Sequence, residues 1–225
     1  MLIFMLACAG KDSDSAEILV QTELSGYVTQ LLGGDGMEGV SVCANTCVTT
    51  DEEGFYNLIS EESSAERLLI MTGDELVSGM VPVLARPPSQ DVPNVSLVSP
   101  ALIEAQMAMV DLEWEEGHGI LVFSFSNGIF GDGVNVSEAV LGMEEAVGDG
   151  PFYTSTQGLP ATDLIKTSRH GGGVWLNLPP GNHRFVPANL PSGCTLLLGW
   201  GSVETIVLPI QADHITFMRV ECIDS

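Results

Sequence analysis

Short runs in which apolar and polar residues alternate recur along the chain, separated by clusters of Gly, Pro, Asn and Asp. In residues 119–125 this alternation places Leu121, Phe123 and Phe125 on one face of a strand, because successive side chains of a strand point to opposite faces. Many short strands between turn residues are typical of β-sandwiches. The pattern therefore predicts an all-β protein.

The two halves of the chain show the same order of segments. Residues 167–171 (TSRHG) match residues 50–54 (TDEEG) in spacing, and we match GVNV at 133–136 to GVSV at 39–42 and WLNL at 175–178 to FYNL at 55–58. We therefore predict two small Ig-like β-sandwich domains built on one plan, spanning 24–98 and 117–225.

A short helix is expected between the two domains, within residues 99–116. Ser99 suits the N-cap position and Pro100 the first helical position. Four apolar residues then fall on one face at three- and four-residue spacing: Leu102, Ala105, Met109 and Leu112. We expect this helix to join the two sandwiches and to pack across their junction.

The segments SGYV, MEGVSVCA and TDEEGFYNL resemble the carboxypeptidase regulatory-like domain, which is a transthyretin-like β-sandwich. Residues 24–98 carry this resemblance, and residues 117–223 are similar to a divergent copy that lacks the aspartate after Thr167. The resemblance implies a fold that is not itself catalytic. Asp51 is expected to hydrogen-bond the amides of its turn and Gly54 to supply a positive φ, with a calcium site at Asp51 as the alternative.

The N-terminal segment ends an apolar run at Met5-Leu6-Ala7-Cys8 and resembles the lipobox of bacterial lipoproteins. The resemblance implies that Cys8 is lipidated and that residues 1–23 are a signal remnant and tether. Because Ala9 replaces the aspartate associated with inner-membrane retention, the outer membrane of a Gram-negative bacterium is favoured. Only seven residues precede Cys8, so we expect the true start to lie upstream. The alternative is a buried N-terminal strand.

With Cys8 assigned to lipid, four cysteines remain, and an even number suits an exported, oxidising compartment. Locality in the sequence favours the disulfides Cys43–Cys47 and Cys194–Cys222, although four cysteines allow three connectivities. Cys43 and Cys47 flank a three-residue connection that suits a hairpin.

The formal net charge of −23 arises from 30 acidic and 7 basic side chains. Such a surface repels phosphate backbones, so no nucleic acid is expected as a partner. No serine-hydrolase elbow or phosphate-binding loop occurs, and the histidines lack paired metal spacing: His118, His170, His183 and His214. We therefore predict no enzyme activity and no cofactor.

Aromatic residues in the second half provide a candidate ligand face at Tyr153, Trp175 and Trp200. The strand-like context of Trp175 and Trp200 favours the core over such a face. The sequence predicts a non-catalytic envelope lipoprotein, either a structural module or one that interacts with an envelope protein. The alternative is a lipoprotein that binds a carbohydrate or peptide. Exposed tryptophan would favour the alternative, and buried tryptophan the structural module.

Overall fold

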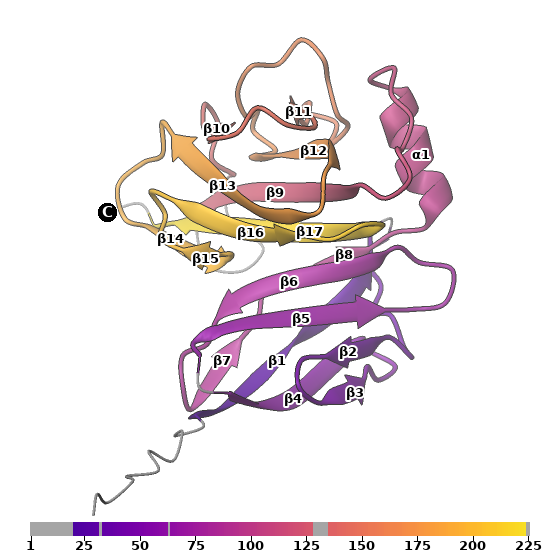
Figure 1. Cartoon of the computed structure of the whole chain (residues 1–225), viewed down its shortest axis with the longest axis vertical. Coiled ribbons are helices and arrows are strands. Elements are labelled where there is room, and N and C mark those ends of the chain that lie inside the picture. Colours follow the sequence, from indigo (N-terminus) through magenta and orange to yellow (C-terminus); the bar gives the residue numbers. More distant parts are fainter. Residues whose placement is uncertain (1–19, 32, 63, 128–134, 224–225) are drawn as a thin grey trace, which may run out of the picture.

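The computed structural model describes residues 20–31, 33–62, 64–127 and 135–223. They form two stacked β-units with a helix beside the second (Figure 1). Cys8 and most of the predicted tether lie outside the described residues. The predicted end of the tether at residue 23 is wrong, because the first strand begins at Val20 and Thr22 is fully buried within it.

The first unit is a sandwich of two sheets, one ordered β4-β1-β7 with β8 also paired to β1, and one ordered β6-β5-β2-β3. Its strands are β1 (Val20–Gln30), β2 (Ser41–Cys43), β3 (Cys47–Thr49), β4 (Phe55–Glu62), β5 (Glu66–Thr72), β6 (Ser78–Leu84), β7 (Ser89–Asp91) and β8 (Val95–Leu97). Alternation places Tyr56 and Leu58 of β4 in the core, where they pack with Leu24 and Val28 of β1.

The second unit is also a sandwich. One layer is ordered β11-β12-β9-β17, with β14 also paired to β17, and the other is ordered β10-β13-β16-β15. Its strands are β9 (Gly119–Asn127), β10 (Val140–Met143), β11 (Asp149–Tyr153), β12 (Gly172–Leu178), β13 (Gly181–Ala188), β14 (Cys194–Leu198), β15 (Trp200–Gly201), β16 (Ile206–Ile210) and β17 (His214–Cys222). Leu121, Phe123 and Phe125 all lie in its core, as the alternation predicts. The all-β sandwich fold is confirmed.

Both units use one scheme of strand pairing. In the first, β1 pairs antiparallel with β4 and parallel with β8, and β5 lies between β2 and β6. In the second, β9 pairs antiparallel with β12 and parallel with β17, and β13 lies between β10 and β16. The second unit therefore repeats the connectivity of the first.

The two units share a sheet. The N-terminal part of β17 pairs in parallel with β6, with Ile215 opposite Gly79, while β17 also pairs with β9 along its length. One sheet thus runs from β11 in the second unit to β3 in the first. Helix α1 (Pro100–Ala108) joins the units along the chain, but in space they meet directly through β6 and β17.

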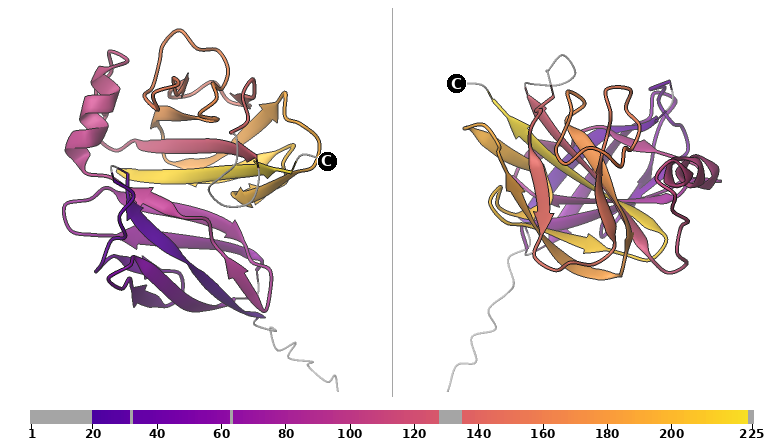
Figure 2. Two further views of the ribbon diagram at one scale, coloured as in Figure 1. Left: turned by 180° about the vertical axis from the view of Figure 1, so that it is seen from behind. Right: turned by 90° about the horizontal axis from the view of Figure 1, so that it is seen from above.

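The buried face of the helix agrees only in part with the predicted one. Leu102 and Leu112 are half-buried against the same cluster, but Ala105 is exposed. Ile103, Met107 and Val110 are buried, whereas Met109 is 52% exposed. The buried side chains cover residues of β9 and β12, such as Ile120 and Leu176, and form a cluster that includes Val77 and Val98 of the first unit. The helix therefore covers one end of the junction, on the outer face of the second unit's sheet (Figure 2). Among the described residues, no helix is long and apolar enough to cross a membrane.

Candidate functional site

A buried threonine anchors the predicted turn in each unit. Thr50 Oγ1 accepts a hydrogen bond from the backbone N of Val40 at 2.9 Å, and Thr167 Oγ1 accepts one from the backbone N of Ala139 at 2.9 Å. Each hydroxyl also donates to the carbonyl three residues before that partner. Val40 therefore corresponds to Ala139. The sequence match of residues 39–42 to 133–136 is wrong, and residues 133 and 134 lie outside the described residues.

The glycines that end these turns are required by the backbone. Gly54 and Gly171 have φ values of 77° and 66°. A Cβ atom at Gly54 would lie 2.2 Å from the Val28 carbonyl oxygen, and one at Gly171 would lie 2.3 Å from that of Phe125. A side chain would be strained at either glycine and would collide with the neighbouring strand.

Asp51 has the structural role that was predicted for it. Its Oδ1 accepts hydrogen bonds from the backbone N of Glu53 at 3.0 Å and of Phe55 at 2.9 Å. In the second unit, Ser168 Oγ accepts only from the backbone N of His170, at 3.1 Å. Within the described ranges, no group of three or more His, Cys, Asp or Glu side chains could hold a metal ion. A calcium site at Asp51 remains a prediction to be tested.

The disulfide Cys43–Cys47 closes a short hairpin whose loop packs against the edge strand β4. It closes the connection between β2 and β3, and the two polar side chains inside the loop reach the edge of β4. Asn45 Nδ2 donates to the Glu61 carbonyl at 2.9 Å, and Thr46 Oγ1 donates to the Ile59 carbonyl at 3.0 Å. The cross-linked loop thus covers part of an edge strand that would otherwise present free carbonyl groups.

The second disulfide, Cys194–Cys222, joins β14 to the end of β17, and the two cysteines are directly opposite in the strand pairing. The structure thus contains both of the disulfides that sequence locality favoured.

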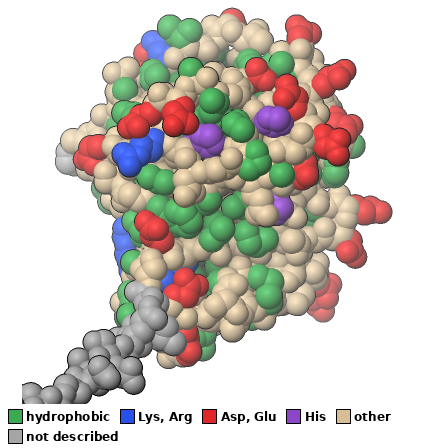
Figure 3. All heavy atoms as spheres, in the orientation of Figure 1, with side chains coloured by type: hydrophobic (Ala, Val, Ile, Leu, Met, Phe, Trp, Pro, Cys, Tyr) green, Lys and Arg blue, Asp and Glu red, His purple; other side chains and the backbone are tan. Residues whose placement is uncertain are grey.

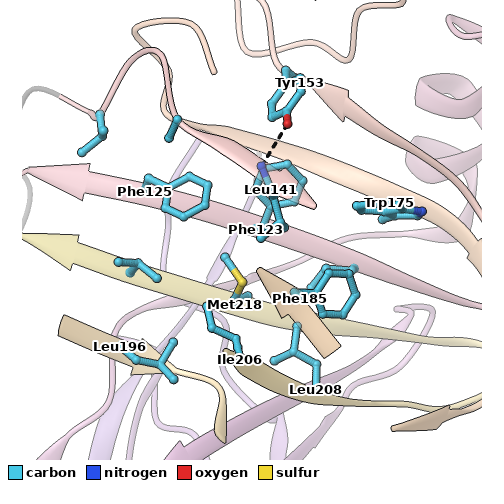
Figure 4. Close-up of a cluster of buried hydrophobic side chains, with 14 of the residues drawn as sticks. Phe123, Phe125, Leu141, Tyr153, Trp175, Phe185, Leu196, Ile206, Leu208 and Met218 are labelled. Carbon is cyan, nitrogen blue, oxygen red and sulfur yellow. Dashed lines mark hydrogen bonds between the residues drawn. The ribbon is translucent and has the colours of Figure 1, made fainter. Parts of the chain in front are cut away.

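The predicted ligand face does not exist as an exposed surface. Tyr153 is 1% and Trp175 6% exposed, and both rings pack in the core of the second unit among Phe123 and Phe185 (Figure 4). The Tyr153 hydroxyl accepts a hydrogen bond from the backbone N of Leu141 at 3.0 Å. Burial raises the pKa of Tyr153 above its usual range. These side chains fill the interior because the alternation of their strands directs them inward.

Each of the three tryptophans donates its indole N–H to a backbone carbonyl of the chain. Trp114 Nε1 donates to the His118 carbonyl, Trp175 Nε1 to the Val147 carbonyl, and Trp200 Nε1 to the Arg67 carbonyl at 3.1 Å. The half-buried Trp200 belongs to the second unit and Arg67 to the first, so this last hydrogen bond crosses the junction. The tryptophans therefore support the fold.

An aromatic pair, an exposed Tyr27 and a half-buried Phe55, lies instead on the outer face of β1 and β4. Tyr27 is 40% exposed, and its ring centroid lies 5.2 Å from that of Phe55. β7 and β8 both pair with β1, but the residues between them do not. A hollow of about 380 Å³ lies at this break, beside the aromatic pair. Its polar lining includes Ser25, Asp91 and Asn94, and Ser25 Oγ donates to Asp91 Oδ1 at 3.1 Å. We call this site the aromatic hollow.

Sequence reasoning missed the aromatic hollow, although its signal was present. Leu24, Gly26 and Val28 alternate along β1 and face the core, so Tyr27 must face outward. The same parity, applied to Tyr56 and Leu58, points Phe55 outward.

The histidines do not form a reactive group with one another. His183 Nε2 donates to the Pro179 carbonyl at 2.8 Å, and His214 Nδ1 donates to the Ala212 carbonyl at 2.7 Å. His118 lies 3.6 Å from the carboxylate of Glu115 on an exposed turn, and His170 is exposed. Among the described residues we find no nucleophile held by a base that is itself oriented by a third group.

Acidic side chains line the right-hand border of the face in Figure 3, whereas hydrophobic side chains gather in its middle, over β5 and β6. This distribution agrees with the excess of acidic residues in the sequence. The described surface therefore offers little attraction to a polyanion.

No family model matches the chain, and no curated protein matches it. Solved structures do match. The minor pilin GBS52 of Streptococcus agalactiae is 10% identical, with coverage of 92% of this chain and 96% of that one and a TM-score of 0.33. The shaft pilin SpaA of Lactobacillus rhamnosus GG is 7% identical, with coverage of 91% and 98% and a TM-score of 0.28. The Bacillus anthracis TIE protein is 13% identical, with a TM-score of 0.29; the match covers 92% of this chain but 34% of that one. At these values the likeness carries no argument about function.

Proposed function

We propose that the chain is a non-catalytic module of the cell envelope that acts as a rigid structural or protein-interaction element. The observation that carries this proposal is the sheet shared by both units through β6 and β17. Backbone pairing across a junction resists bending far more than a flexible linker does, so the pair of sandwiches acts as one body.

The side-chain chemistry supports the same function. Asp51, Thr50 and Thr167 hold turns, and the tryptophan indoles hold the core and the junction. Purified protein should therefore leave envelope polymers intact. Hydrolysis of peptidoglycan, measured by release of soluble fragments, would overturn the non-catalytic proposal.

We propose further that Cys8 is lipidated and anchors the protein in the membrane, in the outer membrane of a Gram-negative envelope. Export to an oxidising compartment agrees with the two disulfides. Expression of the gene from its natural start should place the protein in the membrane fraction, and Cys8→Ser should release it. Retention of Cys8→Ser with unchanged detergent behaviour would contradict the anchor.

A second candidate function is glycan binding, and the aromatic hollow favours it. Sugar rings present apolar C–H faces that suit an aromatic surface and hydroxyl groups that suit Asp91 and Asn94. A glycan and peptidoglycan-fragment screen should detect binding that Tyr27→Ala abolishes. Ile59→Ala is the matched control, because Ile59 is 49% exposed on the same face of β4 but lies outside the hollow. Equal binding by both variants would exclude the hollow.

A further inference from the structure

A second concave site lies where the two units meet, and we call it the junction cleft. Its volume is about 210 Å³, and its walls come from the end of β1, from β8, α1, β9, β14 and β17. The left view of Figure 2 shows this side of the molecule, where β9 and β17 lie beside α1 and close to the end of β1. Clefts between structural units are common places for ligands.

The walls of the junction cleft are mainly apolar. Met218 and Val220 of β17 point into the core of the second unit, so Phe217 and Arg219 face the other way. Phe217 lines the cleft together with Val122 of β9 and the residues that follow β7. A hydrocarbon group bound there would be shielded from water on several sides, which favours binding.

Arg219 gives the junction cleft a positive charge. Arg219 is half-buried and its Nε atom is buried without an acceptor. Its side chain makes no hydrogen bond or ion pair with any residue that the structure describes. Arg67 also has a buried Nε without an acceptor, but its charge is paired with Glu62, and the charge of Lys166 is paired with Glu138. The charge of Arg219 has no such carboxylate partner among the described residues. A buried donor without an acceptor destabilises the protein, and an anion in the cleft would remove that cost.

We propose that the junction cleft binds a small amphipathic carboxylate, with the carboxylate against Arg219 and the hydrocarbon against Phe217 and Val122. A cavity of about 150 Å³ holds benzene, so this volume suits about eight non-hydrogen atoms. Hexanoate has this size. The inference goes beyond the proposed function and does not depend on it, since a structural module can carry a ligand site at its junction.

The test uses the full chain with Cys8→Ser and a titration with hexanoate, followed by NMR of the backbone amides. The buffer contains about 0.15 M salt, so that the excess negative charge of the protein is screened beyond roughly 8 Å. We expect saturable shifts at Gln106, Val122 and Arg219. Arg219→Gln should weaken binding about tenfold or more, because it removes a charge-assisted hydrogen bond.

Arg184→Gln is the matched control, because Arg184 is an exposed arginine on β13, outside the cleft, and its loss changes the net charge equally. This variant should bind hexanoate as the parent does. Equal weakening by the two substitutions would overturn the proposal, and so would shifts confined to other surfaces. If Arg219→Gln fails to fold, hexan-1-ol decides: binding as tight as that of hexanoate would show that the cleft does not recognise a carboxylate.

Discussion

The two units build the same turn with different side chains. The threonine bonds and the final glycine correspond in position, but Asp51 accepts two backbone hydrogen bonds where Ser168 accepts one. Ser168 Oγ instead donates to the Thr154 carbonyl at 2.7 Å, which ties the second turn to a neighbouring segment. The threonine and the glycine are therefore common to both turns, whereas the residue after the threonine and its hydrogen bonds differ between the units.

A second pair of positions shows an exchange of aromatic ring and glycine. In the first unit Tyr56 of β4 lies opposite Gly26 of β1, and a Cβ atom on that glycine would lie 2.9 Å from the tyrosine hydroxyl. In the second unit Phe123 of β9 lies opposite Gly173 of β12, whose Cβ atom would lie 2.4 Å from the phenylalanine ring. Each pair places one ring over one glycine, but the ring is on the second strand of the pair in the first unit and on the first strand in the second unit. The total side-chain volume in the interior is thus similar.

Replacing the turn glycines should have the largest effect, and an equal one in both units. Gly54→Val and Gly171→Val should each lower the free energy of unfolding by about 3–5 kcal/mol, because a strained φ combines with a backbone collision. Urea denaturation measures this cost. Gly34→Val is the control: its φ is 74° but nothing lies within 4 Å of its Cβ, so only about 1–2 kcal/mol should be lost. A similar loss in all three variants would mean that the collision is not important.

The buried threonines should show the next largest effect. Thr50→Val and Thr167→Val keep the side-chain volume but leave a buried N–H without an acceptor, so each should cost about 2 kcal/mol in urea denaturation. Costs that differ by more than about twofold would contradict the structural equivalence of the two turns.

The sequence predicted the two turns and several of the strands, mainly in the first unit, because their signals are local. It misaligned the strand before each turn, since the second unit places Glu138, with a φ of 72°, where the first has Gly39. A glutamate gives no sign of a positive φ. The sequence match therefore paired Gly39 with the glycine at 133, where a Gly-Val pair occurs, and not with Glu138.

Features set by distant contacts could not be predicted in this way. The pairing of β6 with β17 joins strands more than a hundred residues apart, and no local pattern specifies it. The buried face of α1 is likewise determined by the sheet that it packs on, because helix residues 102–108 are apolar on more than one side. The aromatic hollow depends on the break between β7 and β8, although the outward direction of Tyr27 follows from parity.

The difference between Asp51 and Ser168 should be smaller but measurable. Asp51→Ala should cost about 1–2 kcal/mol and Ser168→Ala about 1 kcal/mol. Each change removes two hydrogen bonds, but those to the Asp51 carboxylate are the stronger because hydrogen bonds to a charged group contribute more than those of a neutral hydroxyl. Asp51→Asn keeps an acceptor and should change the melting temperature only slightly. A rise in melting temperature with calcium that disappears in Asp51→Asn would instead make the acidic turn a metal site.

The smallest effect is expected from Tyr56→Phe, which gives the first unit the ring found in the second. The Tyr56 hydroxyl is buried without a partner, so its removal should be neutral or stabilise the protein by up to about 1 kcal/mol near pH 7. Burial raises the pKa of Tyr56. The unfolded chain therefore ionises this group near pH 10 while the folded chain resists, and stability should fall as the pH rises above that value. Tyr56→Phe should reduce this alkaline loss, and an unchanged loss would contradict the assignment.

The direct test of the shared sheet uses Thr50→Val and the tryptophan fluorescence of unfolding in urea. The three tryptophans, Trp114, Trp175 and Trp200, all follow residue 98, so they report on the second unit and the junction, whereas the substitution lies in the first unit. If β6 and β17 bind the units into one body, the fluorescence midpoint should fall by about 0.5–1 M urea, together with the midpoint from circular dichroism. A fluorescence midpoint that stays at its wild-type value while circular dichroism detects an earlier loss of structure would show that the two sandwiches unfold independently.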